Sequence, residues 1–356
     1  MSITKETLNK SLRGRVAASR GARSLAHLIA MSRSLRSVPL ASGHPRYVSQ
    51  QPAKHVTYRS FALVLATFLT SAVAAQTFSG KLTATGGVTT VEGAGGGGLT
   101  PWALITGYGT DRQIGGNVHY TAVRTRDYAL QAGGVALGLF DRVELSAAKQ
   151  KFDTRDVLIP ISPALRGYKL EQDTFGLKVR LLGDAIYDQD RALPQIAVGV
   201  QHKRNLDDTV IPFLNGALGG GIRTRGTDFY VSATKLYLEP GVLANATVRF
   251  TKANQYGLLG FGGPDGDRLR PEFEFSLAYL VRPDLAVGVE GRTKRGRLAN
   301  SALNLREQAA YDAFVAWFPS KHLSLTLAYV DLGQIVGALT NDRRQRGWYA
   351  SLQAGF

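Results

Sequence analysis

The chain has 356 residues, with 40 glycines, no cysteine and a formal charge of +16 at pH 7. The lack of cysteine excludes disulfides, thiolate metal sites and cysteine nucleophiles. Residues 1–59 carry a net charge of +10 and the remainder only +6, so the main part lacks the basic stripe that nucleic-acid binding requires.

The amino-terminal part predicts export. Residues 1–53 are rich in Arg and Ser, and we assign them no fold: they are a disordered extension, an organelle-targeting peptide, or the product of a start codon placed too early. Residues 54–75 predict a signal peptide, because Lys54 and Arg59 precede an apolar run that ends in small residues. An uncleaved anchor or a buried helix is the alternative. The mature domain is then expected at 76–356.

Beyond Gln76 no run of 18 apolar residues occurs, and segments of about ten residues alternate instead between apolar and polar side chains. In "PEFEFSLAYLV", for example, Phe273 and Phe275 lie on one face and Glu272 and Glu274 on the other. Ten residues is the length that a tilted strand needs to cross a bilayer. The expected strands lie near residues 80–91, 99–108, 115–124, 129–139, 142–152, 170–181, 194–204, 227–238, 242–252, 271–281, 285–294, 310–318, 322–332 and 347–356.

The connections between these strands favour a membrane barrel over a soluble sandwich. From the fourth strand onward they alternate between short and long, which is typical of an up-and-down barrel and not of Greek-key sheets. We therefore predict an all-β fold, a transmembrane up-and-down antiparallel β-barrel of about 14 strands with both ends in the periplasm. Twelve strands is the alternative, with the Gly-rich stretch 86–102 acting as a plug or linker.

The carboxyl terminus predicts how the barrel is assembled. The last segment places Trp348, Leu352 and Phe356 on one apolar face and ends on the aromatic residue. A terminal aromatic residue suits a membrane interface, and this ending is similar to the signal that barrel-insertion machinery reads. The expected partners are outer-membrane lipid, the barrel-assembly machinery, periplasmic chaperones and small solutes, with no nucleic acid and no cofactor.

Charged residues on the polar faces predict a charged lumen, since a charge facing lipid at mid-membrane costs about 2 to 4 kcal/mol. These residues either line a pore or fill the barrel as an ion-pair network, and we favour a narrow channel. Lys235 is the exception: it falls on the apolar face and must extend to the membrane surface. The expected lumen-lining residues are Glu144, Lys178, Arg180, Lys203, Arg249, Glu272, Glu274, Glu290, Arg292 and Asp312.

One expected outer loop, "ANQYGLLGFGGPDGDRL", has an apolar centre at Leu258, Leu259 and Phe261. Apolar loop residues are unusual in water, so we expect this loop to fold into the lumen as a constriction or to lie on the membrane rim. Deleting residues 257–263 is then expected to raise single-channel conductance.

Signals for catalysis and metal binding are weak. A barrel hydrolase would need a nucleophile next to a base, and the exported part has only His119, His202 and His322, spread over different segments. The Gly-rich stretch lacks the Lys-Ser/Thr of a phosphate-binding loop and reads as a flexible turn. The acidic clusters at 188–190 and 265–267 do not fit a calcium-loop spacing, and we expect no metal site.

Six runs carry a resemblance to a known family: "GGGLTPWALITGYGTD", "GLFDRVELSAAKQKFDT", "DFYVSATKLYL", "TKANQYGLLGFGG", "DAFVAWFPSKHLSLTLAYVDLG" and "QRGWYASLQAGF". Together they resemble a proteobacterial family of exported outer-membrane proteins described by a domain of unknown function. The resemblance implies a porin-like barrel and brings no catalytic residues. We therefore expect a porin-like passive channel for small solutes in the bacterial outer membrane. The alternatives are a closed structural or adhesive barrel that acts through its outer loops, and a lipid or peptide hydrolase.

Overall fold

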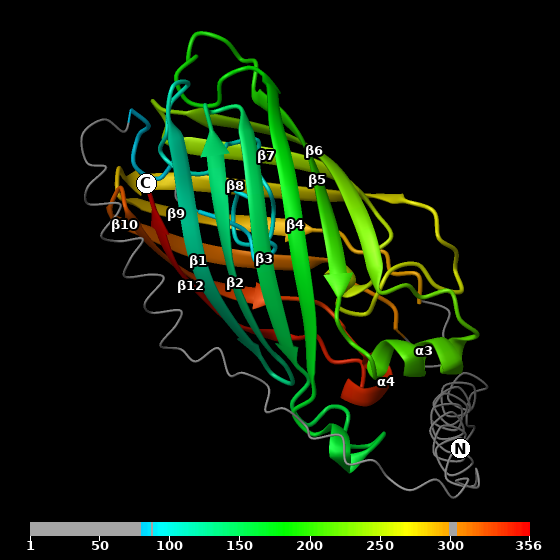
Figure 1. Ribbon diagram of the computed structural model, residues 1–356. Helices are drawn as coiled ribbons and strands as arrows, with labels where there is room; N and C mark the ends of the chain where they lie inside the picture. Colours follow the sequence, from blue (N-terminus) through cyan, green and yellow to red (C-terminus); the bar gives the residue numbers. More distant parts are fainter. Residues whose placement is uncertain (1–79, 87, 299–304) are drawn as a thin grey trace, which may run out of the picture.

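The protein is a closed antiparallel β-barrel. The computed structural model describes residues 80–86, 88–298 and 305–356, and the proposed extension and signal peptide lie outside this part. Each strand pairs with its neighbours in sequence, and β1 pairs with β12 to close the barrel (Figure 1). The strands are β1 (Ile114–Thr125), β2 (Ala129–Leu139), β3 (Val143–Asp153), β4 (Lys169–Leu182), β5 (Gln195–Asn205), β6 (Arg225–Tyr237), β7 (Val242–Thr251), β8 (Arg270–Arg282), β9 (Leu285–Arg292), β10 (Ala310–Ser320), β11 (Leu323–Asp331) and β12 (Arg346–Gly355).

The alternation of side chains produces an apolar exterior. In β8 the side chains of Phe273 and Phe275 are exposed, whereas those of Glu272 and Glu274 are buried inside the barrel. The same pattern recurs around the barrel, and an exposed belt of this size is compatible with lipid but not with water. The belt includes Val135, Leu137, Leu145, Phe175, Leu177, Phe229, Val231, Leu277, Tyr279, Val289, Val315, Trp317, Leu327, Tyr329 and Trp348.

Within the described part of the chain, every helix is too short or too polar to cross a bilayer. The helical elements are η1 (Pro163–Leu165), α3 (Val210–Leu218), η2 (Gln255–Gly257) and α4 (Gly337–Thr340).

The two ends of the barrel differ, as the sequence predicts. Five connections meet at one end, here called the turn end, and they span 140–142, 183–194, 238–241, 283–284 and 321–322. Five longer ones meet at the other end, here called the loop end, and they span 154–168, 206–224, 252–269, 293–309 and 332–345. The carboxyl terminus lies at the turn end, and α3 and α4 lie at the loop end (Figure 1).

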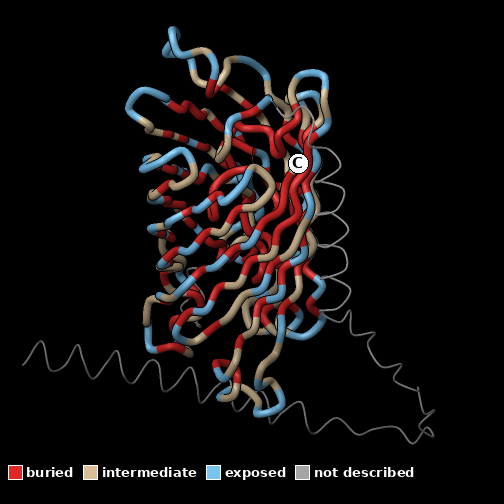
Figure 2. The backbone as a smooth tube through the Cα atoms, turned by 90° about the vertical axis from the view of Figure 1, so that its left-hand side faces the viewer, coloured by how far each residue is buried: buried red, intermediate tan, exposed pale blue. Residues whose placement is uncertain are grey.

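The expected number of strands is corrected from 14 to 12, which was the alternative. The segments near 80–91 and 99–108 are not wall strands: they belong to a stretch that enters the lumen from the turn end and returns to it. Every residue from 89 to 109 is buried. Figure 2 shows that much of the backbone within the barrel is buried, whereas exposed residues gather at its two ends and along its outer surface. We call residues 88–106 the plug. Its fold is stabilised by isolated bridges between Thr89 and Gly95 and between Gly96 and Pro101.

Lys235 corrects a second expectation. It has the outward phase of β6, but its side chain does not extend to the membrane surface, because the connection 183–194 folds over it. Its Nζ donates to the carbonyl oxygens of Asp184 at 3.3 Å, Leu193 at 3.4 Å and Asp188. The ammonium is thus covered by protein instead of lipid, and three acceptors replace its water.

The loops at the loop end pack into an apolar cap. Helix α3 is fixed by Asp207, whose carboxylate accepts the Ile211 N–H at 2.6 Å, and it ends at Gly219, whose φ of 82° suits glycine. The five long connections and the short turn 126–128 between β1 and β2, six connections in all at this end, each contribute to a single buried cluster, which removes their apolar side chains from water. One member from each connection is Tyr128, Val157, Ile211, Leu258, Leu298 and Ile335.

Candidate functional site

The side chains expected to line the lumen point inward. Most of them form ion pairs or hydrogen bonds with other groups of the protein. Arg180 is half-buried near the turn end, and the other nine are between 0 and 7% exposed. These nine are Glu144, Lys178, Lys203, Arg249, Glu272, Glu274, Glu290, Arg292 and Asp312. Much of their pairing is with the plug, which occupies the lumen in this conformation, and the expected narrow channel stays a prediction.

Glu92 of the plug lies in a cluster of buried charges. Its carboxylate is 2.9 Å from Arg292 Nη1 and 3.7 Å from Arg249 Nη2, and it also contacts Lys203 Nζ. The wall supplies two more carboxylates. Asp228 lies 2.7 Å from Lys203, and Glu274 lies 2.5 Å from Arg249 and 3.1 Å from Arg292.

This cluster, here called the Glu92 cluster, contains three acids and three bases, so its formal charge is zero only when Glu92 is present. Every side chain in it is at most 5% exposed. Burying one unpaired charge is far more costly than burying a balanced set, so the wall is electrostatically complete only with the plug in place.

A second anchor holds the plug nearer the turn end. Glu144 and Lys178 form a buried ion pair at 2.9 Å. The Glu144 carboxylate accepts the N–H groups of Gly95 and Thr106, both at 2.9 Å. Lys178 donates to the carbonyls of Gly95 at 2.9 Å and Leu104 at 2.7 Å. The plug is not part of a sheet, so some of its backbone N–H and C=O groups need other hydrogen-bond partners. The Glu144–Lys178 pair supplies them.

The glycines of the plug allow its backbone to approach the wall closely. A Cβ built on Gly97 would lie 1.8 Å from Glu290 Oε1. Glu290 accepts from Leu99 N at 2.8 Å, Thr100 Oγ1 at 2.7 Å and Ser276 Oγ at 2.6 Å. The Gly-rich stretch is thus not the flexible turn that its composition indicates but a tightly packed segment, in which glycine permits contact with the wall.

Arg180 belongs to a separate group at the turn end. Its guanidinium contacts Asp141 and lies 3.0 Å from Asp184, and Asp141 also pairs with Lys81 at 2.7 Å. Lys81 precedes the plug in sequence, so this group fixes the point where the chain enters the barrel. The charged side chains of this group therefore stabilise the turn end of the lumen and do not line its middle.

The loop with the apolar centre folds into the mouth of the barrel. Leu258, Leu259 and Phe261 are all buried. Inward side chains of the wall hold its backbone: Asn205 donates to the carbonyl of Leu258 at 2.8 Å, and Gln172 donates to that of Tyr256 at 3.2 Å. This loop, residues 252–269, is here called the mouth loop. The loop lies in the mouth of the barrel, and its role as a constriction stays a prediction.

The mouth loop meets the plug at the Glu92 cluster. The Arg292 guanidinium lies 4.2 Å from the ring centroid of Tyr256, a cation–π distance, and Lys203 Nζ lies 3.5 Å from the Tyr256 carbonyl. Both cations also contact Glu92. Two segments that enter from opposite ends of the barrel therefore share the same basic side chains.

Beneath the cap lies an apolar cavity of about 120 Å³, lined by side chains such as Tyr128, Phe152, Leu214 and Leu259. The rings of Tyr128 and Phe152 stack at 5.1 Å. A polar solute in this cavity would lose its hydration without gaining hydrogen-bond partners.

Two titratable groups of the loop end hold the mouth loop in place. Burial raises the pKa of the Glu307 carboxyl to about 7, although nearby Lys294 opposes the shift. Burial lowers the pKa of Lys294 to about 8. Glu307 Oε1 accepts the Gln255 N–H at 2.9 Å, and Lys294 Nζ donates to Gln255 Oε1 at 3.0 Å. The first residue of η2, Gln255, is thus held by two groups that titrate near neutral pH.

The carboxyl terminus lies beside the base of the plug. The Phe356 carbonyl accepts the N–H groups of Tyr108 at 2.9 Å and Gly116 at 3.0 Å. Trp348 is 68% exposed on the outer surface, and Leu352 is exposed on the same face of β12. Of the three residues of the predicted assembly signal, Trp348 and Leu352 are outward side chains of β12, and Phe356 is half-buried one residue beyond the end of that strand.

The three histidines lie apart. His119 is buried in β1 without a hydrogen-bond partner for either ring nitrogen. His202 Nδ1 is 3.0 Å from Thr227 Oγ1 on the outer surface, and His322 Nδ1 is 2.9 Å from the Gly355 carbonyl at the turn end. None of these pairs is the Ser-and-acid arrangement of a hydrolase.

One acid of each expected acidic cluster is paired with a base. Asp267 lies 2.9 Å from Arg223 and 3.0 Å from Lys252, and Asp188 lies 3.9 Å from Arg191. Among the described residues, no group of three potential ligands is placed to hold a metal ion.

The sequence analysis missed three residues of the site. Glu92 is the one acid in the Gly-rich stretch 86–102. Its isolation could have identified it, since a single charge in a buried segment needs partners of opposite charge. Asp228 has the inward phase of its strand, opposite Phe229, so the alternation could have identified it. Tyr256 carries no such signal, because its role depends on how the mouth loop folds.

Comparison with known proteins gives one family and several solved structures of similar shape. No curated protein matches the chain. The KdgM porin has a TM-score of 0.43 at 8% identity, covering 67% of this chain and 99% of that one. The outer-membrane phospholipase A from Escherichia coli has 0.37 at 8%, covering 70% and 93%. The COG4313 outer-membrane channel from Pseudomonas putida F1 has 0.37 at 13%, covering 72% and 96%.

The sequence profile of one family matches residues 85–353, which include the plug and nearly all of the barrel. The family carries the description "Protein of unknown function (DUF3034)". The match spans most of the chain, and the chain belongs to this family.

Proposed function

We propose that the protein is an outer-membrane channel for small solutes whose plug closes it in this conformation. The observation that carries the proposal is the Glu92 cluster. The wall presents three buried bases and two buried acids, and the charge that balances them comes from a separate segment of the chain. A wall built only as a solid support could hold its own balanced or apolar core at lower cost.

The plug is suited to movement because many of its contacts with the wall are polar, alongside the apolar packing of Trp102 and Leu104 against wall residues. Glu92 forms ion pairs with three bases of the wall. The backbone of Gly95 forms hydrogen bonds with Glu144 and Lys178, and the Leu99 N–H donates to Glu290. Polar contacts can be exchanged for water when the lumen hydrates, whereas an apolar core would resist this exchange. In the open state, the charged side chains of the wall would line a hydrated path for small solutes.

Export and insertion complete the proposal. Residues 54–75 act as a signal peptide that is removed, and the apolar belt is embedded in the lipid of the outer membrane. The barrel-assembly machinery and periplasmic chaperones recognise the outward face of β12, including Trp348 and Leu352. The turn end, which holds both the plug entry and Phe356, then faces the periplasm, and the cap faces outward.

The filled lumen also favours one other function, a closed barrel that acts through its outer loops. The six connections at the loop end pack into one apolar cluster, and a rigid cap of this kind could serve as an adhesive surface. This alternative differs from the channel in one respect: weakening the plug would not make it conduct.

The test is planar-bilayer conductance of the full chain and of Glu92→Gln. Removing this charge leaves one unbalanced base in the lumen, so the plug is held less firmly and openings become at least about tenfold more frequent. The matched control is Glu239→Gln, which neutralises an exposed acid in the turn between β6 and β7. A folded Glu92→Gln barrel as silent as the control would contradict the channel and favour the closed barrel.

A further inference from the structure

The cavity of about 120 Å³ beneath the cap, here called the cap cavity, is followed deeper in the lumen by one of about 60 Å³, here called the inner cavity. The inner cavity lies between the plug and the mouth loop, which contribute Val91 and Leu258 to its walls. Phe152, Leu259 and Ile335 line both cavities. The two cavities are therefore parts of one apolar space that these side chains divide.

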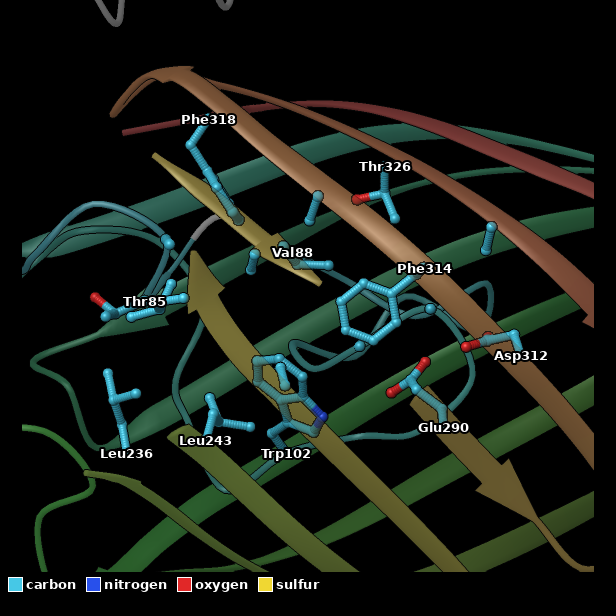
Figure 3. A pocket seen from close by; sticks show the side chains of 18 of the residues that line it. Thr85, Val88, Trp102, Leu236, Leu243, Glu290, Asp312, Phe314, Phe318 and Thr326 are labelled. Carbon is cyan, nitrogen blue, oxygen red and sulfur yellow. The ribbon is translucent and has the colours of Figure 1, made fainter. Parts of the chain in front are cut away.

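A third cavity, of about 40 Å³, lies nearer the turn end, between the plug and the wall. Trp102 of the plug and Phe314 of β10 form part of its walls, and Glu290 and Asp312 lie at one end of it (Figure 3). Tyr349 lines both this cavity and the inner cavity. Because the third cavity is the smallest of these and contains two buried acids, it suits an apolar molecule less well than the cap cavity does.

The walls of the cap cavity are apolar. They include Leu158, Leu170, Leu214, Leu259, Ile335 and Leu339. The two threonines of the wall use their hydroxyl groups elsewhere: Thr154 Oγ1 donates to the Tyr168 carbonyl at 2.9 Å, and Thr209 Oγ1 donates to Asp208 at 3.0 Å. A buried water molecule needs about two to four polar partners, so this cavity is poorly suited to water.

The cap cavity lies close to the surface at the loop end. Leu165, Phe213 and Leu339 line it from three different connections, and all three side chains are half-buried. Its deeper wall includes Leu170 and Leu214, which are buried. Only side chains of the rim therefore separate the cavity from its surroundings, and side chains of this kind change rotamer rapidly. A small molecule can enter from the loop end while the plug stays in place.

We propose that the cap cavity binds a monocyclic aromatic hydrocarbon. Apolar cavities of about 150 Å³ stay dry and bind benzene, so a volume of about 120 Å³ fits one six-membered ring closely. Tyr128, Phe152 and Phe213 line the cavity, and aromatic rings pack favourably against one another in edge-to-face or offset arrangements. An empty cavity leaves its walls without dispersion contacts, and a ring of this size supplies them.

Other ligand classes fit the cap cavity less well. A charged or strongly polar molecule would lose its water of hydration without gaining hydrogen bonds from these walls. A lipid acyl chain needs an elongated groove, whereas Phe152 and Leu259 close the cavity on its inner side. A compact apolar molecule matches both the volume and the chemistry of the walls.

The experiment is methyl NMR of the full chain in lipid nanodiscs during a titration with benzene. We expect the methyl signals of Leu214 and Ile335, which line the cap cavity, to shift and to saturate. The methyl signals of Leu277, which is exposed on the outer surface, should shift only in proportion to the benzene dissolved in the bilayer. Pyrimidine, a ring of the same size with polar nitrogens, should bind at least about tenfold more weakly than benzene.

Two substitutions change the cavity in opposite directions. Leu339→Trp places a larger side chain at the rim and should weaken benzene binding at least about tenfold. Its control, Leu327→Trp on the outer surface of β11, should leave benzene binding unchanged. Leu259→Ala joins the cap cavity to the inner cavity. Naphthalene, which is too large for the cap cavity alone, should therefore bind this variant at least about fivefold more tightly than the unaltered protein.

Three results would overturn the proposal. They are shifts at Leu214 that stay linear like those at Leu277, equal binding of pyrimidine and benzene, and unchanged benzene binding in Leu339→Trp together with unchanged naphthalene binding in Leu259→Ala. Leu339→Trp, at the half-buried rim, keeps the proposal testable should Leu259→Ala fail to fold. The proposal goes beyond conduction, because binding is measured on the closed barrel. A protein that binds benzene but never conducts contradicts only the channel, and one that conducts without binding benzene contradicts only this site.

Discussion

The carboxylate of Glu92 in the plug lies 2.9 Å from the guanidinium of Arg292 on β9, at side-chain exposures of 1% and 5%. Arg292 also faces the ring of Tyr256 at 4.2 Å, so one side chain of the wall contacts both the plug and the mouth loop. The two segments that fill the lumen are therefore linked through this residue. Loss of Arg292 should loosen both of them.

The first prediction concerns stability. Arg292→Gln leaves three acids against two bases in the Glu92 cluster and should lower the free energy of unfolding by about 3 to 5 kcal/mol, the usual cost of breaking a buried pair. Urea unfolding in lipid, followed by the heat-dependent shift of the folded band on a gel, measures the change. Arg282→Gln, at the exposed pair with Asp284, is the control and should change stability by less than about 1 kcal/mol.

The double variant Glu92→Gln/Arg292→Gln tests whether charge balance is the cause. It leaves two acids and two bases, so we expect it to regain at least half of the stability lost in Arg292→Gln. A double variant that is less stable than either single variant would show that packing, and not charge, holds the plug.

The second prediction concerns pH at the mouth loop. Burial raises the pKa of Glu307 to about 7, above its ordinary value of 4.5. The stability that proton binding contributes is therefore fully present below about pH 4.5 and is lost as pH rises through about 7. Hydrogen exchange of residues 253–263, corrected for intrinsic rates, should show about tenfold less protection at pH 8 than at pH 5.

Glu307→Gln should remove this dependence, because the amide oxygen still accepts the Gln255 N–H but does not titrate. Glu239→Gln at the turn end should retain it. Equal protection of the mouth loop at both pH values in the unaltered protein would refute the role of Glu307.

The third prediction is that the plug and the mouth loop act as two barriers in series along the lumen. Deleting residues 257–263 removes the centre of the mouth loop but leaves the plug, so it should change conductance little on its own. In the Glu92→Gln background the same deletion should raise single-channel conductance at least about twofold, since the narrowest remaining segment has been removed. Identical conductance with and without the deletion in that background would argue against a constriction.

The fourth prediction concerns Lys235 beneath the turn-end connection 183–194. Lys235→Met removes the donor that three carbonyl oxygens share, so the connection should loosen by about 1 to 3 kcal/mol. Cleavage by trypsin after exposed Arg191 should become at least about fivefold faster. The control variant Lys151→Met removes one partner of an exposed surface ion pair, and trypsin should cleave it after Arg191 at the unaltered rate.

The wall of the barrel could be predicted from the sequence because the pattern that defines it lies in residues that are neighbours in the chain. Neighbouring residues such as Phe273 and Glu274 differ in the solvent they require, and this difference alone assigns them to the outer and inner faces. The alternation of short and long connections then gives the topology, which the structure confirms. The inward positions of Lys178 and Arg249 follow from the same rule.

The plug could not be predicted in the same way. The segments near 80–91 and 99–108 alternate as wall strands do, but residues 89–109 are all buried inside the barrel, so the alternation there carries no information about a lipid face. The partners of Glu92 lie far along the chain, at separations of 111 residues for Lys203 and 200 for Arg292. Only closure of the barrel brings them together, and a pattern of neighbouring residues does not encode it.

The position of Lys235 has a similar explanation. Its outward phase is correctly given by the alternation of β6, and the sequence indicates that a charge there is costly in lipid. The solution, a connection that folds over the outer surface, depends on the conformation of residues 183–194. The charge was therefore identifiable from the sequence, but its carbonyl partners were not.

Conductance of a plug locked by an engineered disulfide tests the central claim most directly. Thr100 Oγ1 of the plug and Ser276 Oγ of β8 are in hydrogen-bond contact, and the chain has no native cysteine, so Thr100→Cys/Ser276→Cys places one cross-link between plug and wall. The control is Thr121→Cys/Ser351→Cys, which joins two wall strands whose hydroxyls are 2.8 Å apart. The account predicts that the oxidised plug-to-wall variant is silent and that reduction restores openings, whereas the control conducts in both states. Equal conductance of the plug-to-wall variant before and after reduction would contradict it.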